Sequence, residues 1–586
     1  MSAARRTRRR RSAGLSAGRL TVVACAGLLG FAALLVRAVQ LQTLDAEWLA
    51  TRAERQGATT LEFEPLRAEL RDRSGRPLAV SASVESVAAS PRLVEDRHAA
   101  ARALAKALHV SAKDLDRPLS QGASFVWLQR WVTPDAAERV RALALTGVHL
   151  HRERRRFYPN GSLGGPVLGF ADRDGRGLSG VELLYDRELR GAGAELKVNR
   201  DGGGRVLPTE TRAPETRAGQ PITLALDLEL QHFAEKVLAE SLRKTGARHA
   251  TLVALDPSNG EILALAESPS FDPNRFWLED SSAYRARAFV DTFEPGSTLK
   301  PFSIAAALEA GVTRPDEVFD CEGGRYRIGR RTIRDFHPHD LLTVSDILRV
   351  SSNIGAAKIS ERLGARRLVD GIRRFGFGRT TGSAFPGEVP GSVREIREKQ
   401  AVERANLSFG QGLTVTPIQL VAGMAVFANG GLRVTPRITR VPSDPPSVAS
   451  ERVLSEHTAR AVLLMMQQVV ENGTGKLAAL PHVAVAGKTG TAQKVKEGIY
   501  SQSDYIASFV GIVPVVNPRF VIGVFIDEPR GVHTGGMVAA PVFREVAGYA
   551  LDRLGSGGGA PGRSPAPAVR PARLSTEGDG AGGRAG

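Results

Sequence analysis

The longest run of apolar positions lies close to the N-terminus. Residues 20–36 include no charged side chain, and a helix needs about 20 apolar residues, within a range of about 17–25, to cross the hydrocarbon core of a bilayer. A cleaved signal peptide usually has a shorter apolar segment of about 7–15 residues, and this run ends at Arg37 without a small-x-small cleavage site. We therefore expect an uncleaved transmembrane helix over residues 20–41. No second run of this kind follows, so we expect a single crossing.

The segment before this run is strongly basic, within a chain of formal net charge +17. It has no acid before position 45, and its arginines are Arg5, Arg6, Arg8, Arg9, Arg10, Arg11 and Arg19. A basic leader over residues 1–19 is also typical of nucleic-acid binding. Directly before a membrane span, however, the positive-inside rule places such a segment in the cytoplasm. We expect a cytoplasmic N-terminus, an extracytoplasmic chain beyond the span, and no nucleic-acid partner.

Short strand-like and helix-like pieces alternate over residues 42–215, which we interpret as one domain. Residues 133–143 are helical in pattern, with Thr133 at the N-cap and Pro134 at the first helical position. The arginine-rich run at residues 152–156 is interpreted as a solvated face. Residues 555–586 consist mainly of Gly, Pro, Ala, Ser and Arg, and such a composition predicts a disordered tail because it cannot bury a core.

A second domain is predicted over residues 216–554. Asn259-Gly260 between two apolar runs is a strong hairpin signal. One strand pair is expected at residues 252–255 and 261–265, and a second at residues 505–515 and 520–526. A closing helix is expected at residues 541–554. Strands at both ends with helices between them predict an α+β domain, with an antiparallel sheet covered by helices. Cys25 lies in the apolar run and Cys321 far downstream, so we expect no disulfide to support this fold.

The first chemical candidate is Ser297 with Lys300, three residues later. Residues 297–310 are helical in pattern, so both side chains share one face at a helix start. A serine hydroxyl is a poor nucleophile until a base takes its proton, and a lysine of lowered pKa is such a base. Alone, Ser-x-x-Lys is more often an ordinary pattern on an exposed helix.

Two further polar segments follow. Ser351-Ser352-Asn353 lies between two helix-like stretches, where Ser351 would relay a proton and Asn353 would hold an amide; alone it is an ordinary helix break. Lys488-Thr489-Gly490-Thr491 follows an apolar run and is interpreted as a strand whose glycine permits close approach of another backbone or a substrate. A nucleotide-binding loop is excluded because His482 stands where that motif requires glycine.

The three segments together are far more specific than any one. The order Ser-x-x-Lys, Ser-x-Asn, Lys-Thr-Gly is the signature of penicillin-recognising serine enzymes. His337, Pro338 and His339 are interpreted as a loop rather than a metal pair, and Asp335 beside them as a turn residue. His533 is a weaker candidate for lining the cleft.

With these motifs, the chain resembles the class B penicillin-binding proteins, and among them the division-type, FtsI-like septal transpeptidases. The resemblance covers nearly all of residues 20–553. It includes residues 67–75, where Ala68 departs from the usual glycine, and also residues 156–159, 177–182, 294–296, 386–388 and 408–412. It implies a single transmembrane helix, an elongated α/β pedestal (dimerisation-type) domain and a penicillin-binding transpeptidase domain, with no glycosyltransferase domain before the pedestal.

The resemblance also implies a mechanism without metal or organic cofactor. Lys300 deprotonates Ser297, which attacks the penultimate D-Ala carbonyl of a stem peptide, and terminal D-Ala leaves with help from Ser351 and Lys488. The backbone N–H groups of Ser297 and Thr491 form the oxyanion hole, and Thr489 and Thr491, around Gly490, hold the substrate carboxylate with Lys488. Asn353 completes the catalytic set. β-Lactams would acylate the same serine.

The implied location is the inner membrane at the division septum, with an FtsW-like glycan polymerase and other division proteins as partners. Three alternatives remain: a membrane-anchored β-lactamase or β-lactam sensor, an elongation-type transpeptidase, and a catalytically idle scaffold. The intact set of motifs argues against the scaffold, and the anchor and pedestal favour a wall synthase.

Overall fold

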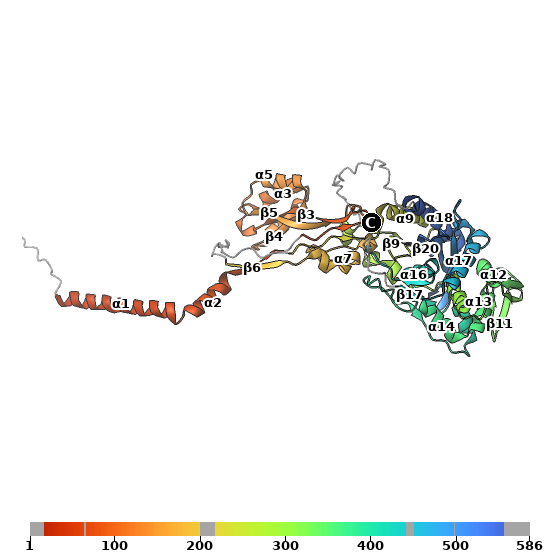
Figure 1. The fold of residues 1–586 in the computed structure, drawn as a ribbon. Coiled ribbons are helices and arrows are strands. Elements are labelled where there is room, and N and C mark those ends of the chain that lie inside the picture. Colours follow the sequence, from red (N-terminus) through yellow and green to blue (C-terminus); the bar gives the residue numbers. More distant parts are fainter. Residues whose placement is uncertain (1–16, 64–65, 200–216, 441–449, 497, 556–586) are drawn as a thin grey trace, which may run out of the picture. The chain divides into compact units, whose positions relative to one another are not determined.

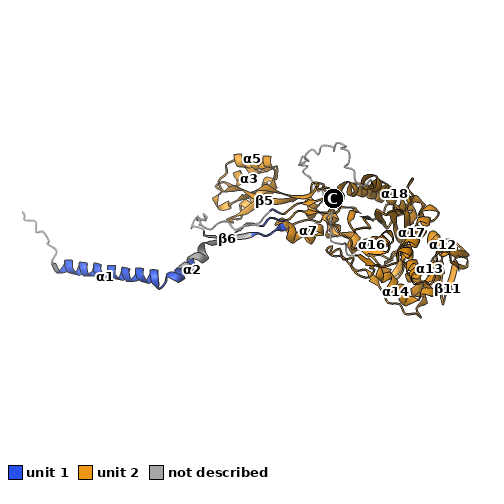
Figure 2. Ribbon diagram, in the orientation of Figure 1, with its two compact units in different colours: residues 1–66, 190–219 blue, residues 67–189, 220–586 orange. Residues whose placement is uncertain are grey.

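The computed structural model describes residues 17–63, 66–199, 217–440, 450–496 and 498–555. Most of the basic leader and of the C-terminal tail therefore lies outside the described residues. The chain divides into two compact units, residues 1–66 with 190–219 and residues 67–189 with 220–586 (Figure 2).

The first unit contains the expected apolar helix. Helix α1 spans Ala17–Thr43, and an 18-residue window within Gly18–Thr43 has a mean hydropathy of 2.3 and no buried share. This length and composition suffice to cross a membrane. Helix α2 (Ala46–Gly57) follows, and strand β1 (Ala58–Phe63) pairs antiparallel with β6 (Ala194–Asn199).

The pedestal part of the second unit is a sheet covered on one face by helices. Its strands run in the order β4-β3-β2-β7, and β5 also pairs with β3. Their bounds are β2 Leu70–Arg71, β3 Pro77–Ala89, β4 Val126–Val132, β5 Val148–Phe157 and β7 Ile222–Thr223. Helices α3 (Arg97–Leu108), α4 (Ala112–Leu119) and α5 (Pro134–Ala142) share one apolar core with β3 and β4. The predicted cap is confirmed, since the Thr133 hydroxyl accepts the N–H of Ala136 at 3.3 Å.

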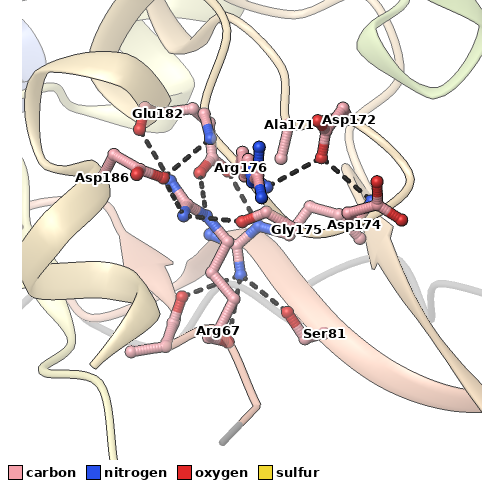
Figure 3. A network of polar contacts seen from close by, with 12 residues as sticks. Arg67, Ser81, Ala171, Asp172, Asp174, Gly175, Arg176, Glu182 and Asp186 are labelled. Carbon is pink, nitrogen blue, oxygen red and sulfur yellow. Dashed lines mark hydrogen bonds and ion pairs between the residues drawn. The ribbon is translucent and has the colours of Figure 1, made fainter. Parts of the chain in front are cut away.

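A buried polar network lies at the base of this sheet (Figure 3). The Arg67 guanidinium donates to Glu182 and to Asp186, each at 2.6 Å, and Arg156 donates to Glu182 at 2.8 Å. Glu182 is fully buried on α7 (Gly180–Leu184), and the Tyr158 hydroxyl donates to it at 3.2 Å. Because Arg156 is almost fully covered, the interpretation of residues 152–156 as one solvated face is wrong at this position.

The transpeptidase part is built on a five-stranded sheet (Figure 1). The strands follow the order β18-β19-β20-β8-β9 and are all antiparallel. Their bounds are β8 His249–Leu255, β9 Ile262–Ser268, β18 Ala486–Lys496, β19 Ile499–Val513 and β20 Phe520–Asp527. The β8–β9 hairpin and the β19–β20 pair confirm both predicted strand pairs.

The two faces of this sheet belong to two apolar cores. Leu252 and Ala254 pack with helices α9 (Leu228–Thr245) and α18 (Gly535–Leu554), whereas Val253 and Leu255 pack with the opposite layer. This alternation follows from the two-residue period of a strand. The opposite layer includes α11 (Lys300–Glu309), α16 (Pro417–Ala428) and α17 (Glu456–Glu471).

Helix α18 begins at Gly535, earlier than the predicted start at residue 541, and contains Pro541. The first turns fit tightly against the sheet, because a Cβ on Gly535 would lie 2.1 Å from the Ser508 carbonyl oxygen. Gly535 therefore permits a close helix–strand contact.

Candidate active site

The candidate nucleophile lies in a tight turn between a loop and a buried helix. Ser297 belongs to a 3₁₀ turn, Gly296–Leu299, and α11 begins at Lys300. The sequence predicted one continuous helix here. Lys300 itself has right-handed helical geometry, with φ −55° and ψ −39°, and Pro301 follows in the first turn of α11, where a missing N–H is tolerated. In a 3₁₀ turn, side chains three residues apart eclipse, so Ser297 and Lys300 face each other.

The Lys300 amine is the centre of the site. It is completely buried, and its Nζ lies 3.2 Å from Ser297 Oγ and 3.1 Å from Ser351 Oγ. It donates to the Ser351 carbonyl oxygen at 2.6 Å and to Asn353 Oδ1 at 2.8 Å. The structure thus brings the first two sequence motifs together around one nitrogen.

Ser351 and Asn353 stand between two helices, as predicted. Helix α12 (Val344–Val350) ends at Ser351, whose φ of +65° and ψ of +41° are left-handed, and α13 (Asn353–Leu363) follows. A non-glycine residue held in this conformation costs about 1–2 kcal/mol. The kink turns both the carbonyl and the hydroxyl of Ser351 toward the Lys300 amine.

Asp335 is the residue at this site that the sequence did not identify. Its carboxylate accepts the Ser352 hydroxyl at 2.5 Å, and the N–H groups of Asn353 and Ile354 at 2.5 and 3.0 Å. A carboxylate at a helix N-terminus is favoured by the helix dipole. Asp335 therefore fixes the start of α13, and with it Asn353; it is more than the turn residue expected from the sequence.

The third motif lies on strand β18 beside the turn. Lys488 is completely buried, and its Nζ donates to Ser351 Oγ at 3.0 Å. A Cβ on Gly490 would lie 2.8 Å from Thr298 Cγ2 and 3.1 Å from the Pro295 carbonyl oxygen. Gly490 therefore permits the close backbone approach predicted for it.

The hydroxyl groups of this strand contact its neighbours. Thr489 Oγ1 lies 2.7 Å from Thr474 Oγ1, and Thr491 Oγ1 accepts the Gly535 N–H at 3.2 Å. The start of α18 is thus fixed to the candidate binding strand.

Burial and neighbouring charges shift the pKa values of the two buried lysines. Burial lowers the pKa of Lys300 to about 7, against a smaller raising effect of the Asp335 carboxylate. Burial, and then the charge of Lys300, lower the pKa of Lys488 well below that of a free lysine. The pocket therefore disfavours two ammonium groups. A neutral Lys300 amine would donate its two hydrogens to the Ser351 carbonyl and Asn353, leaving its lone pair for the proton of a serine hydroxyl.

Two further segments support the nucleophile turn. Glu294 accepts the Gly412 N–H at 2.8 Å and the Tyr500 hydroxyl at 3.1 Å. The Gly296 N–H donates to the Gly410 carbonyl at 3.0 Å. Gly410 and Gly412 therefore hold the loop that leads into the nucleophile turn.

The remaining histidine candidates lie apart from this centre. The His533 ring stacks on Tyr505 with centroids 4.1 Å apart and is hydrogen-bonded to Gly531. His337 lies in an exposed loop against Phe336. Neither ring contacts the lysine–serine cluster among the described residues.

Comparisons with known proteins identify the family of the chain. The chain matches the penicillin-binding protein dimerisation domain over residues 62–224 and the penicillin-binding protein transpeptidase domain over residues 250–548. It is 37% identical to the probable peptidoglycan D,D-transpeptidase PenA of Neisseria meningitidis, covering 92% of this chain and 93% of the relative. It is 36% identical to the peptidoglycan D,D-transpeptidase FtsI of Escherichia coli, covering 89% and 90%.

A solved structure gives the same result. Penicillin-binding protein 3 of Mycobacterium tuberculosis, determined in complex with aztreonam, is similar with a TM-score of 0.66 and 28% identity, over 86% of this chain and 99% of that one. The matches span both domains rather than the transpeptidase part alone. The chain therefore belongs to the class B penicillin-binding proteins and is a serine-type peptidoglycan D,D-transpeptidase.

Proposed function

We propose that this transpeptidase cross-links stem peptides at the division septum through an acyl-enzyme on Ser297. The observation that carries the mechanism is the buried amine of Lys300, which lies within hydrogen-bond distance of both Ser297 and Ser351. An amine with a pKa of about 7 is matched to accepting and returning a proton at neutral pH.

In the acylation step, Ser297 Oγ bonds to the carbonyl carbon of the penultimate D-Ala while its proton passes to Lys300 Nζ. The C–N bond to the terminal D-Ala then breaks. The leaving nitrogen takes a proton through the Ser351 hydroxyl, which lies between Lys300 and Lys488 at 3.1 and 3.0 Å. In the second step, an acceptor amine attacks the ester carbon and its proton passes to Lys300; the C–O bond to Ser297 then breaks as Lys300 returns that proton to Ser297 Oγ, 3.2 Å away.

The developing oxyanion is assigned to the backbone N–H groups of Ser297 and Thr491. Removing one such donor costs about 10²–10³ in rate in other acyl-transfer enzymes. Thr489, Thr491 and Lys488 would hold the terminal carboxylate beside Gly490. The second hydrogen of Asn353 Nδ2, whose first is donated to the Arg334 carbonyl at 3.0 Å, would meet the acyl amide.

Penicillin labelling tests this assignment. Fluorescent penicillin is expected to label the purified full-length protein covalently and to leave Ser297→Ala unlabelled. Ser303→Ala, which removes a buried hydroxyl from the following helix α11, is the matched control and should still label. Undiminished labelling of Ser297→Ala would remove Ser297 from the mechanism.

A β-lactamase uses the same motifs, and turnover distinguishes the two enzymes. With a chromogenic cephalosporin, a transpeptidase gives a burst of about one equivalent, since the acyl-enzyme persists. Sustained fast hydrolysis would support the lactamase alternative instead.

The septal role rests on residues 294–296 and on similarity to FtsI, whereas the membrane orientation rests on the arginines that precede the apolar run. We propose that residues 1–19 lie in the cytoplasm, residues 20–41 span the membrane, and residues 42–215 and 216–554 form the extracytoplasmic pedestal and catalytic domains. An FtsW-like polymerase is the proposed membrane partner. A fluorescently tagged chain should accumulate at midcell; a sidewall distribution would favour the elongation-type alternative.

A further inference from the structure

The pedestal sheet has a second face, opposite helices α3–α5, that carries aromatic and basic side chains. Val148 and Leu150 of β5 pack toward the helices, so the alternate residues of this strand, including His149, His151 and Arg155, point away from them. We name this face the Arg–Trp surface and define it by Phe125, Trp127, Arg130, Trp131, Arg155 and Arg173. Phe125 and Trp127 are 43% and 38% exposed.

Three guanidinium groups surround the Trp131 ring. Their Cζ atoms lie 5.7, 5.1 and 5.6 Å from its centroid for Arg130, Arg155 and Arg173 respectively. Trp277, on the 3₁₀ segment Pro273–Leu278 of the catalytic part, approaches the same ring at 6.4 Å and is 48% exposed. The surface therefore continues from the pedestal onto the catalytic part of the same unit.

The acids of this region form a direct ion pair with only one of these arginines among the described residues, although the charge of Arg173 contributes to lowering the pKa of Glu153. Glu153 pairs with Arg130, whose Nε donates at 3.0 Å, and is also bonded by the Ser86 hydroxyl. Within the part of the chain that the structure describes, Arg155 and Arg173 form no ion pair or hydrogen bond. Burial lowers the pKa of Arg155, as expected where a cation is desolvated without a compensating acid.

A third donor on this surface lacks an acceptor. Trp131 Nε1 is buried and has no hydrogen-bond partner among the described residues. Buried polar groups in folded proteins are nearly always paired, so an unpaired indole N–H on a ring that the Arg155 and Arg173 guanidiniums approach indicates a missing acceptor. Planar guanidiniums bind carboxylates with two parallel hydrogen bonds.

We propose that the Arg–Trp surface binds an acidic segment of a partner polypeptide, with a carboxylate at Arg155, Arg173 and Trp131 Nε1. Apolar side chains of the same segment would cover Phe125, Trp127 and Trp277. The exposed aromatic rings favour a polypeptide over a phosphate polymer or an anionic lipid, because charge alone would satisfy those ligands. Arginine and tryptophan are also the residues that contribute most strongly to protein–protein interfaces.

The tryptophans of the chain make this proposal directly measurable. Of its four tryptophans, only Trp48, on α2, lies outside the Arg–Trp surface and its continuation at Trp277. The full-length protein carrying Trp48→Phe, in detergent, would be titrated with a synthetic Glu-Glu-Leu repeat peptide while its tryptophan fluorescence is recorded. A saturable change is expected with this peptide, and none with the uncharged Gln-Gln-Leu repeat.

Matched variants localise the binding. Arg155→Gln is expected to weaken it about tenfold or more, the loss of one charge-assisted contact, whereas Arg152→Gln, on the opposite face of the same strand, should leave it unchanged. Arg173→Gln gives a second test at an exposed position where misfolding is not expected, and thermal unfolding checks every variant.

Three results would overturn the proposal. They are absence of saturable binding, binding that survives both Arg155→Gln and Arg173→Gln, and binding of phosphatidylglycerol vesicles or polyphosphate at these arginines without binding of the acidic peptide. The last result would assign the surface to a lipid or a phosphate polymer instead.

Discussion

At the residue scale, the Lys300 amine connects the side chains around it. It contacts Ser297, Ser351 and Asn353, and its protonation state decides whether Ser297 can lose its proton. Burial favours the neutral amine, whereas the Asp335 carboxylate favours the ammonium form. The balance between these two effects gives the site a pH dependence that can be measured.

Acylation by penicillin is expected to slow as the pH falls below about 7. The pKa of Lys300 is lowered to about 7, so the amine is neutral above this value and protonated below it, and a protonated amine cannot accept the serine proton. The second-order rate of covalent labelling, measured by quenched flow between pH 5 and 9, should follow one protonation. A rate that rises toward acidic pH would contradict the role of Lys300 as base.

Replacing Asp335 tests the opposing charge. In Asp335→Asn the raising effect on the Lys300 pKa is lost, so the midpoint of the same pH profile should move to lower pH. The rate at its plateau should also fall, because the N–H groups of Asn353 and Ile354 lose a charged acceptor. Asp316→Asn, at an exposed position, is the control and should leave the profile in place. A midpoint that moves upward would refute the assignment.

At the element scale, the site is assembled where strands and helix termini converge. Strand β18, the 3₁₀ turn before α11 and the N-terminus of α18 approach so closely that only glycine fits at their contacts. A Cβ on Gly535 would lie 2.1 and 2.3 Å from the carbonyl oxygens of Ser508 and Gly490. The start of α18 therefore packs directly against β18, so a displacement of one would disturb the other.

Two glycines of α18, one packed against β18 and one with space around it, test this close contact. Gly535→Ala should displace the helix start from β18, lower the melting temperature and slow penicillin labelling at least about tenfold, since small misplacements of reacting groups cost rate steeply. In Gly548→Ala on the same helix, the added Cβ would approach only Leu480 Cδ2 among the described residues, at 3.6 Å. This variant should retain labelling and gain stability, because alanine is the better helix former by about 1 kcal/mol. Equal behaviour of the two variants would contradict this packing argument.

The buried network of the pedestal supports a second prediction at this scale. In Glu182→Ala, the guanidinium of Arg156 loses its only carboxylate partner among the described residues, and that of Arg67 keeps Asp186 alone. Leaving such a charge uncompensated costs about 3–5 kcal/mol. Glu85→Ala removes a more exposed pair with Arg141 and should cost at most about 1 kcal/mol. Chemical unfolding of both variants measures the difference.

At the scale of the whole molecule, the catalytic and pedestal parts of the second unit are joined by polar contacts as well as apolar ones. Glu235, on α9, accepts the N–H of Gly164 at 2.7 Å and the Gln231 amide at 2.8 Å. Burial raises the pKa of Glu235 to about 7, partly opposed by these two hydrogen bonds. This contact therefore responds to pH near neutrality.

The sign of this response follows from the raised pKa. The folded state binds the proton of Glu235 more tightly than the unfolded state does, so the stability that it contributes is present at acidic pH and is lost as the pH rises through about 7. Glu235→Gln, which is neutral at every pH, should raise the stability at pH 8 by about 1–2 kcal/mol. Its melting temperature should also vary less between pH 5 and 8. A variant that is less stable than the parent at pH 8 would contradict this account.

The sequence by itself determined the features that depend on neighbouring residues. The apolar run gave α1, Asn259-Gly260 gave the β8–β9 hairpin, and Thr133-Pro134 gave the start of α5, because hydrophobic length, turn chemistry and capping act over a few positions. The three short motifs also indicated the reaction class, since their residue types and order carry the chemistry.

Only the tertiary structure decided which distant groups meet. Asp335 resembled a turn residue until folding placed its carboxylate at the N–H groups of Asn353 and Ile354. Arg156 and Arg155 are neighbours in one basic run, yet folding buries the first against Glu182 and leaves the second beside Trp131, with no ion pair among the described residues. The physical reason is that burial and electrostatic partners come from residues far apart in the chain, whereas propensity and turn preference are local. The same distinction explains why α18 begins at Gly535, where the contact with β18 requires glycine.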